Sequence, residues 1–141
     1  MEFLQPAHWV RPKGYSNGVA AKGRTIFVSG MIGWDAQARI VSADFAGQVR
    51  QALKNIVEVL SEAGAKPEHI ARITWYVVDK KEYLAASREV GAAYRETIGR
   101  HFPAMTVIQV AALLEDQARV EIEVTAVVPD STFDTPGTGS T

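Results

Sequence analysis

The sequence predicts an α+β fold in which helices cover one face of a β-sheet. Two long segments carry apolar residues at helical spacing, and five shorter segments are apolar and have the length of strands. Their order along the chain is strand, strand, helix, strand, helix, strand, strand. A helix with one apolar stripe needs a surface to cover, and a sheet face supplies it. At 141 residues, the chain has the length of one domain with one core.

The first two strands are expected within residues 14–30. Two short apolar runs are broken there by Gly18 and by the turn at residues 22–24, a spacing that is typical of a β-hairpin. A hairpin would pair these two strands with each other.

The segment from residue 44 to residue 63 predicts an amphipathic helix. Its apolar stripe recurs every three or four residues, at Phe45, Val49, Leu53, Ile56 and Leu60. Asp44 or Ser42 can cap the first turn through a side-chain oxygen, and Gly64 lies where a left-handed residue ends a helix. Both ends of the helix are therefore marked in the sequence.

The second half of the chain adds one more helix between strands. Residues 71–79 are rich in β-branched and aromatic residues and predict a strand. Residues 81–98 return to helical spacing, and Gly99 ends that helix. Residues 105–113 and 119–128 are expected to be the two closing strands, separated by a polar turn.

The domain is expected to cover residues 1–128, followed by a flexible tail at residues 129–141. The tail is too poor in apolar residues to offset the entropy lost on ordering. Several of the expected strands are apolar on both faces, whereas helices cover only one. Because an exposed face of that extent usually marks an interface, we expect a closed homo-oligomer in which sheets pack against one another.

Composition excludes several classes of function. Lys and Arg total 15 against 16 Asp and Glu, which leaves no excess positive charge for a nucleic acid backbone. The absence of cysteine excludes disulfides and thiolate metal sites and fits a reducing compartment. No secretory signal and no apolar run of membrane-spanning length is found, so a cytoplasmic protein without membrane contact is expected.

Neither a metal ion nor a cofactor is expected. The three histidines are far apart in sequence, at His8, His69 and His101, and none forms a paired metal-binding motif. The glycines form neither of the two common phosphate-binding motifs, since GTGST lies in the tail instead of between a strand and a helix.

The last strand carries the most informative polar pattern. Strict alternation places Arg119, Glu121, Glu123 and Thr125 on one face of the strand. The face can be a solvated surface, or one glutamate can lie in a subunit cleft, where burial would raise its pKa toward a useful acid or base value. Spacing alone leaves both interpretations open.

Other candidate residues also have two interpretations. Tyr15 and Ser29 offer hydroxyls, which strand-end hydrogen bonding explains equally well, and neither belongs to a serine-hydrolase motif. Trp34 can line an apolar pocket or belong to the packing of the core or an interface.

Six segments, in this order and spacing, carry a family resemblance: GYSNGV, TIFVSGMIGWD, QALKNIVEVLSEAGA, ITWYVVD, FPAMTVIQVAAL and VEIEVTAVV. Together they resemble the Rid family, also called YjgF-like or endoribonuclease L-PSP-like, over roughly residues 12–128. The resemblance implies a chorismate-mutase-like fold, with two helices on one face of a mixed sheet. It also implies a homotrimer with a central β-barrel and small-molecule ligands in clefts between subunits.

The resemblance also implies an activity, the hydrolysis of reactive enamines and imines such as 2-aminoacrylate to ketoacids and ammonia. In the family pattern, an arginine binds the substrate carboxylate, a glutamate positions water, and a tyrosine and a serine complete the cleft. Tyr15, Ser29 and Glu121 match the last three of these, although Lys13-Gly14 stands where Gly-Pro is usual. Gly91 falls where many members carry asparagine.

The position of the arginine is occupied by Met105, in the sequence PAMT. A thioether cannot donate a hydrogen bond to a carboxylate, so small imino acids are expected to bind at least about tenfold more weakly. A pocket with Met105 and Trp34 would suit a larger or aromatic-derived ligand. Arg119, Arg11 and Lys13 are candidate replacement cations, and surface charge or an ion pair with Glu121 is the competing interpretation of Arg119.

The sequence therefore favours a Rid-type deaminase that acts on a non-standard substrate. The alternative is a small-molecule-binding or regulatory trimer that has lost catalysis together with the arginine. Ribonuclease activity, suggested by a family name only, is disfavoured by the near-neutral charge.

Overall fold

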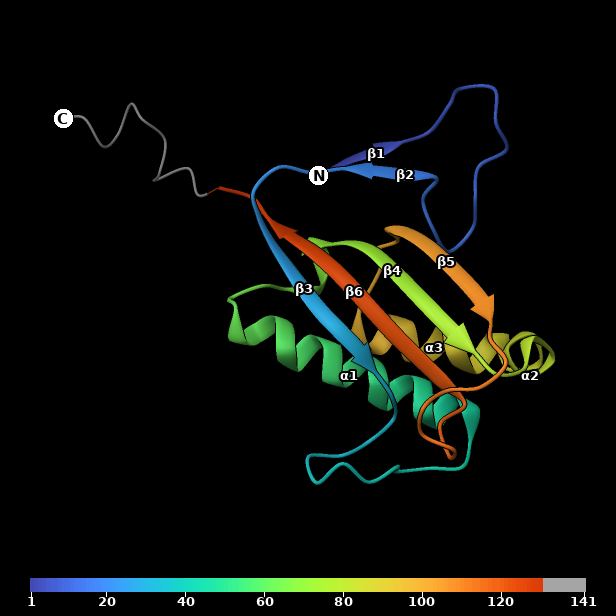
Figure 1. Ribbon diagram of the computed structural model, residues 1–141. Coiled ribbons are helices and arrows are strands. Elements are labelled where there is room, and N and C mark those ends of the chain that lie inside the picture. The colour runs from blue at the N-terminus through green and yellow to red at the C-terminus, as the bar shows by residue number, and fades with distance from the viewer. Residues whose placement is uncertain (131–141) are drawn as a thin grey trace.

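A four-stranded mixed sheet forms the centre of the computed structural model, which describes residues 1–130 (Figure 1). The strands lie in the order β3-β6-β4-β5, with bounds Arg24–Met31, Val120–Val128, Ile70–Val77 and Ala104–Gln109. The β3–β6 and β6–β4 pairs are antiparallel, whereas β4 and β5 are parallel. A parallel pair needs a long crossover, which the helical segment between β4 and β5 supplies.

The helices lie together on one side of this sheet (Figure 1). They are α1 at Phe45–Glu62, α2 at Lys80–Ala85 and α3 at Ser87–Thr97, with a short 3₁₀ turn, η1, at Pro67–His69. The predicted α+β architecture with helices on one face is therefore confirmed. None of these helices is long and apolar enough to cross a membrane, in the part of the chain that the structure describes.

Helix α1 forms as its sequence signals predict. The Asp44 side chain accepts a hydrogen bond from the backbone N–H of Gly47, and Gly64 has the positive φ of a helix-ending residue, 69°. The apolar stripe is fully buried against the sheet, with no exposure at Val49, Leu53, Ile56 and Leu60.

The predicted hairpin within residues 14–30 is wrong in its pairing. The two strands exist, but β2 at Gly18–Ala20 pairs with β1 at Glu2–Leu4, which the sequence did not predict, and β3 pairs with β6. The chain changes direction at Gly23, where φ is 148° and an added Cβ would lie 2.8 Å from the carbonyl carbon of Val128. This close approach directs β3 into the main sheet instead of back along β2.

The predicted single helix at residues 81–98 is divided. Ala86 has φ −97° and ψ 16°, outside ordinary helical values, and separates α2 from α3. The structure thus has three helices where two were expected. The expected flexible tail lies outside the described residues, except for Pro129 and Asp130.

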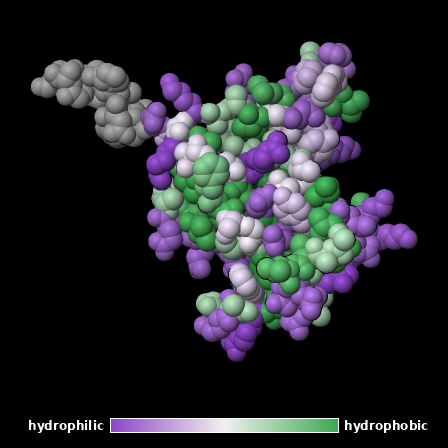
Figure 2. Space-filling model, viewed as in Figure 1, coloured by the Kyte–Doolittle hydropathy of each residue, from purple (hydrophilic) through white to green (hydrophobic). Residues whose placement is uncertain are grey.

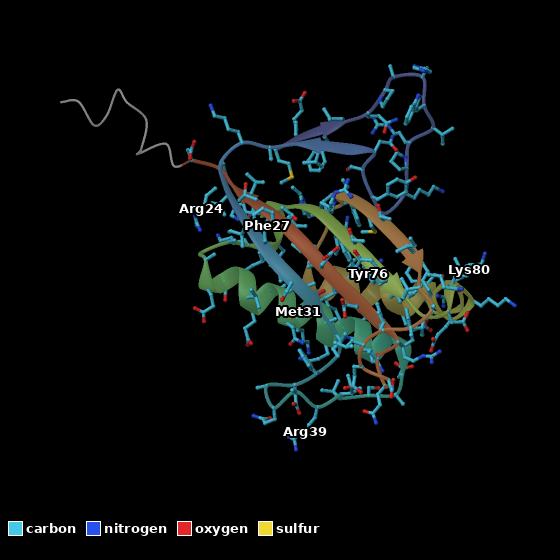
Figure 3. All side chains as sticks on the ribbon, viewed as in Figure 1. Arg24, Phe27, Met31, Arg39, Tyr76 and Lys80 are labelled. Atoms are coloured by element: carbon cyan, nitrogen blue, oxygen red, sulfur yellow. The ribbon has the colours of Figure 1, made fainter. Side chains whose placement is uncertain are left out.

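The expectation that strands are apolar on both faces is wrong for β4, whereas the predicted alternation along β6 is confirmed. Alternation along β4 and β6 places polar side chains on the face without helices, at Arg72, Thr74, Tyr76, Glu121 and Glu123. Large apolar side chains remain on the flanking strands, including Phe27, which is 79% exposed, and Ile108, which is 48% exposed. Apolar and hydrophilic residues are accordingly intermixed on this face (Figure 2), with Phe27 and Tyr76 among them (Figure 3). The oligomer inferred from this face stays a prediction.

Candidate active site

Three of the predicted site residues meet at the edge of the sheet formed by β5. Met105 on β5 pairs with Ile73, and its half-buried side chain packs against the core. It lines a cavity of about 340 Å³ together with Gly91 of α3. Met105 also lines a neighbouring cavity, together with the consecutive residues Lys13, Gly14 and Tyr15. The structure thus brings Tyr15, Gly91 and Met105 together.

Hydrogen bonds of Ser16 fix the position of Tyr15. The backbone N–H of Ser16 donates to the carbonyl of Pro103 at 3.0 Å, and its hydroxyl donates to the carbonyl of Phe102 at 2.5 Å. Ser16 also forms a parallel bridge with Ala104, the first residue of β5. The loop between β1 and β2 is thereby held beside the strand that carries Met105 (Figure 1).

Four aromatic side chains line the cavity between β5 and α3. Trp75 and Tyr83 meet edge to face, with ring centroids 6.1 Å apart, and Tyr94 stacks on Phe102 at 5.8 Å. The indole N–H of Trp75 is buried and has no acceptor within residues 1–130. The cavity is therefore suited to an apolar group.

Ser29, Trp34 and Glu121 form a second group, on β3 and β6 and the loop after β3. The register of β3 against β6 shifts between Val28 and Met31, so an extra residue is accommodated opposite β6. Such bulges re-aim side chains and are frequent beside active sites. Glu121 and Trp34 line a cavity of about 290 Å³, and Ser29 lines an adjacent hollow on the same sheet.

These two groups lie apart within one chain. The cavity lined by Met105 and the cavity lined by Glu121 share no residue. Strands β3 and β5 form opposite edges of the sheet, with β6 and β4 between them. One chain therefore carries two separate halves of the predicted site.

The two glutamates of β6 have different surroundings. The hydroxyl of Tyr76 donates to Glu123 Oε1 at 2.5 Å, and this hydrogen bond, followed by burial, raises the pKa of the Tyr76 phenol. Glu121 has no hydrogen-bond partner among residues 1–130. Tyr76 was missed in the sequence, although alternation along β4 could have placed it on the same face. Of the two carboxylates, Glu121 is the one available to a ligand or a water.

Arg119 is engaged elsewhere. Its guanidinium contacts both carboxylate oxygens of Glu82, with Nη2 2.6 Å from Oε2 and Nε 3.3 Å from Oε1. Arg119 and Met105 line different cavities, so the location of Arg119 does not support its predicted role as a substitute cation, which stays a prediction. The ion-pair interpretation is closer to the structure, with Glu82 as the partner instead of Glu121.

Two cations lie beside Met105: Lys13, a predicted candidate, lines the cavity of Tyr15, and Arg95, which sequence reasoning missed, lines the cavity of Gly91. The only available signal for Arg95 was its spacing of four residues from Gly91, which places both on one face of a helix. No group of three potential metal-binding side chains occurs in the described part of the chain.

Comparison with known proteins decides the family. The sequence model described as Endoribonuclease L-PSP matches residues 9–128. The chain belongs to the endoribonuclease L-PSP family, also called the Rid family. This membership confirms the resemblance seen in the sequence and the α+β fold that the resemblance implies.

Relatives in the Rid family cover most of the chain. A 2-iminobutanoate/2-iminopropanoate deaminase of Homo sapiens is 35% identical over 114 residues, 80% of this chain and 79% of the relative. A RutC family protein of Synechocystis is 31% identical over 132 residues, covering 92% of this chain and 98% of the relative. The crystal structure of a Rid-family protein of unknown function from Yersinia pestis superimposes with a TM-score of 0.77 at 32% identity, over 90% of this chain and 98% of that chain.

Proposed function

We propose that this protein is a Rid-type deaminase that hydrolyses an enamine or imine to a carbonyl compound and ammonia. Water adds to the C=N carbon of the imine, and the resulting carbinolamine expels ammonia as the C=O bond forms. An enamine reaches the same point after it takes up a proton at carbon. Relatives that carry the name 2-iminobutanoate/2-iminopropanoate deaminase support this reaction class.

One observation carries the proposal for this chain: Glu121 lines a cavity and has no hydrogen-bond partner within the described residues 1–130. A carboxylate without a competing partner can accept a proton from water as that water attacks the imine carbon. Tyr15 and Ser29 would orient the substrate through their hydroxyls. No metal or cofactor is required for these steps.

Completion of the site requires more than one copy of the chain. Because Met105 and Glu121 line separate cavities, we propose that the Met105 half of one subunit faces the Glu121 half of another. A cyclic homotrimer would repeat this contact three times and cover the sheet face without helices. Exposed apolar side chains such as Phe27 support burial of that face.

The substrate is proposed to be larger than the smallest imino acids. Met105 cannot provide the ion pair that would favour a small imino acid, and the adjacent cavity of about 340 Å³ is lined by aromatic rings. An imine that carries an aromatic or bulky aliphatic group would gain apolar contacts there. The proposed setting of this reaction is the cytoplasm.

The proposal is tested with imines generated in situ by an amino acid oxidase from alanine, leucine and phenylalanine. Semicarbazide traps the remaining imine, so an active protein lowers semicarbazone formation and accelerates ammonia release. We expect acceleration to be largest with the phenylalanine-derived imine, and Glu121→Gln to abolish it. Absence of acceleration with all three imines would overturn the proposal.

A binding or regulatory trimer is the second candidate function. The methionine in place of the arginine favours it, since a cleft can bind apolar ligands after the carboxylate contact is lost. Saturable ligand binding without ammonia release would support this function over the deaminase.

A further inference from the structure

We infer that Arg95 supplies the positive charge that binds an organic acid in the cavity between β5 and α3, with the aromatic wall holding the apolar part of that acid. The inference deepens the proposed function, because it concerns the ligand of the same cavity. The predicted ligand class is a carboxylate that bears an aromatic or bulky aliphatic group.

The exposed Arg95 side chain lies over Gly91. The two residues are four apart on α3 and therefore lie on the same face, one turn from each other. An added Cβ at Gly91 would lie 3.3 Å from Nη1 of Arg95, so the guanidinium folds back over the glycine toward the cavity that both residues line. Any larger side chain at residue 91 would compete for the space that the guanidinium occupies.

The charge of Arg95 is not neutralised by the rest of the described chain. Ion pairs within residues 1–130 join Arg39 to Asp35, Arg50 to Glu96 and Arg119 to Glu82. Glu96, which follows Arg95 in sequence, is held by Arg50 of α1 at 3.0 Å. Arg95 thus presents an unpaired guanidinium, whose planar donors suit two carboxylate oxygens at once.

The wall of the cavity indicates what the rest of the ligand is. Met105 and the rings of Trp75, Tyr83, Tyr94 and Phe102 surround the space beside the guanidinium. A volume of about 340 Å³ lies at the small end of ligand pockets and can hold one aromatic ring with a short chain. Trp75 is 2% exposed, so its ring contributes apolar surface to this wall.

Lys13 is the competing cation. It lines the neighbouring cavity with Tyr15 and Met105, on the other side of the methionine. A compact ammonium on a flexible stem holds a carboxylate less specifically than a guanidinium does. The experiment therefore includes a variant of each residue.

The test measures binding of 3-phenylpropionate and of its neutral amide, 3-phenylpropionamide, by isothermal titration calorimetry. Arg95→Gln is compared with Arg88→Gln, an exposed arginine on the same helix that lines none of the cavities described above. We expect Arg95→Gln to weaken 3-phenylpropionate about 10- to 100-fold, the effect of one charged hydrogen-bonded pair, and to change amide affinity less than about twofold. Arg88→Gln removes the same charge and should change neither affinity.

Arg95→Lys and Lys13→Gln complete the set. The lysine variant keeps the charge without the paired donors, so we expect an intermediate loss of 3-phenylpropionate affinity, and Lys13→Gln should retain wild-type affinity. The inference would be overturned if Arg95→Gln weakened the acid and the amide equally, or if Arg88→Gln weakened 3-phenylpropionate as much as Arg95→Gln does. It would also be overturned if only Lys13→Gln lost affinity, or if the wild type did not bind 3-phenylpropionate.

Binding and turnover separate this inference from the proposed function. Arg95-dependent binding without ammonia release from any imine would support the inference and overturn the deaminase. Imine hydrolysis by an Arg95→Gln protein that binds 3-phenylpropionate as well as the wild type would support the deaminase and overturn the inference.

Discussion

The carboxylate of Glu121 lies directly over Gly30 of the neighbouring strand. A Cβ built on Gly30 would overlap Oε2 of Glu121 and lie 2.7 Å from its Cδ. Glycine at this position of β3 therefore leaves the space in which the candidate base rests. The register shift of β3 between Val28 and Met31 spans the same residue.

Gly30→Ala should displace Glu121 and spare the fold. The overlapping atoms are at the end of a flexible side chain, so we expect the carboxylate to swing away and imine hydrolysis to fall about as far as in Glu121→Gln. Thermal unfolding at fixed protein concentration should change by only a few degrees. The matched control is Gly30→Ala combined with Glu121→Gln, which should be no less active than Glu121→Gln alone. Full activity of Gly30→Ala would contradict this arrangement.

Gln48→Met should destabilise the protein through lost hydrogen bonds. The Gln48 amide is fully buried in α1 and donates to the carbonyls of Ser42 and Gln117, and it accepts from the backbone N–H of Arg119 at 2.7 Å. Methionine fills the same space without these bonds, so we expect a loss of about 3 kcal/mol in the free energy of unfolding. Urea denaturation measures this loss.

Gln51→Met on the same helix is the control for Gln48→Met. Among residues 1–130 its side chain forms one hydrogen bond, to the neighbouring Asn55, so its loss should stay below about 1 kcal/mol. Equal effects of the two substitutions would show that Gln48 does not hold the start of β6 in place.

The fold could be predicted from the sequence where the signals are local. The cap at Asp44, the stripe of α1 and the positive φ of Gly64 follow from short-range chemistry, and all three are confirmed. The pairing of β2 with β1 could not be predicted in this way, because it depends on contacts between residues far apart along the chain. The break at Ala86 has no Gly or Pro to mark it.

Arg119→Ala should cost little stability and leave ligand affinity unchanged. The Arg119 and Glu82 side chains are 41% and 26% exposed, so their ion pair is expected to contribute only about 0.5–1 kcal/mol. A double-mutant cycle with Glu82→Ala measures this contribution by urea denaturation. Calorimetry with 3-phenylpropionate should give wild-type affinity, and a loss of fivefold or more would restore Arg119 as a candidate ligand-binding cation.

The candidate site was only partly accessible from sequence. Alternation placed Glu121 and Glu123 on one face but could not tell which of them is held by Tyr76. Arg95 was missed because only the folded chain brings α3 and β5 to the two sides of one cavity, where Arg95 and Met105 meet. Residues that line one cavity from different elements carry no common sequence motif.

The protein should lose stability above about pH 10, the usual pKa of tyrosine, partly through Tyr94. Burial raises the pKa of Tyr94, whose hydroxyl donates to the carbonyl of His101 at 2.6 Å. The stability linked to a raised pKa is complete below the unfolded pKa and is lost as pH rises toward the folded one. The loss from one such group approaches about 1.4 kcal/mol per pH unit.

Tyr94→Phe provides the comparison. It removes one hydrogen bond at all pH values, but its unfolding free energy should fall less steeply than that of the wild type between pH 10 and pH 12. The variant should still lose some stability with rising pH, because the pKa values of two other tyrosines are also raised. These are Tyr76, which is hydrogen-bonded to Glu123, and Tyr83, which is buried. Urea denaturation across this range measures the slopes, and parallel curves would contradict a role for Tyr94.

Met105→Arg should shift the specificity of the site toward small acids. A guanidinium in place of the thioether would give a small imino acid a charged hydrogen bond, worth at least about tenfold in affinity. Hydrolysis of 2-aminoacrylate generated in situ should therefore be faster in Met105→Arg than in the wild type. Because Met105 is half-buried and shares its cavity with Arg95, burial and like-charge repulsion should lower stability by about 1–2 kcal/mol.

Met105→Gln is the matched control, since it adds polarity and a hydrogen-bond donor at similar length without charge. Hydrolysis of 2-aminoacrylate that is found in Met105→Arg, but not in the wild type or Met105→Gln, should be lost again when Glu121→Gln is added. That result would show that the catalytic groups around Glu121 are intact and that residue 105 selects the substrate. Inactivity of the wild type and of Met105→Arg toward every imine would mean that catalysis was lost at more than this position. The binding or regulatory trimer would then be favoured, because both halves of the cleft can hold a ligand without a working base.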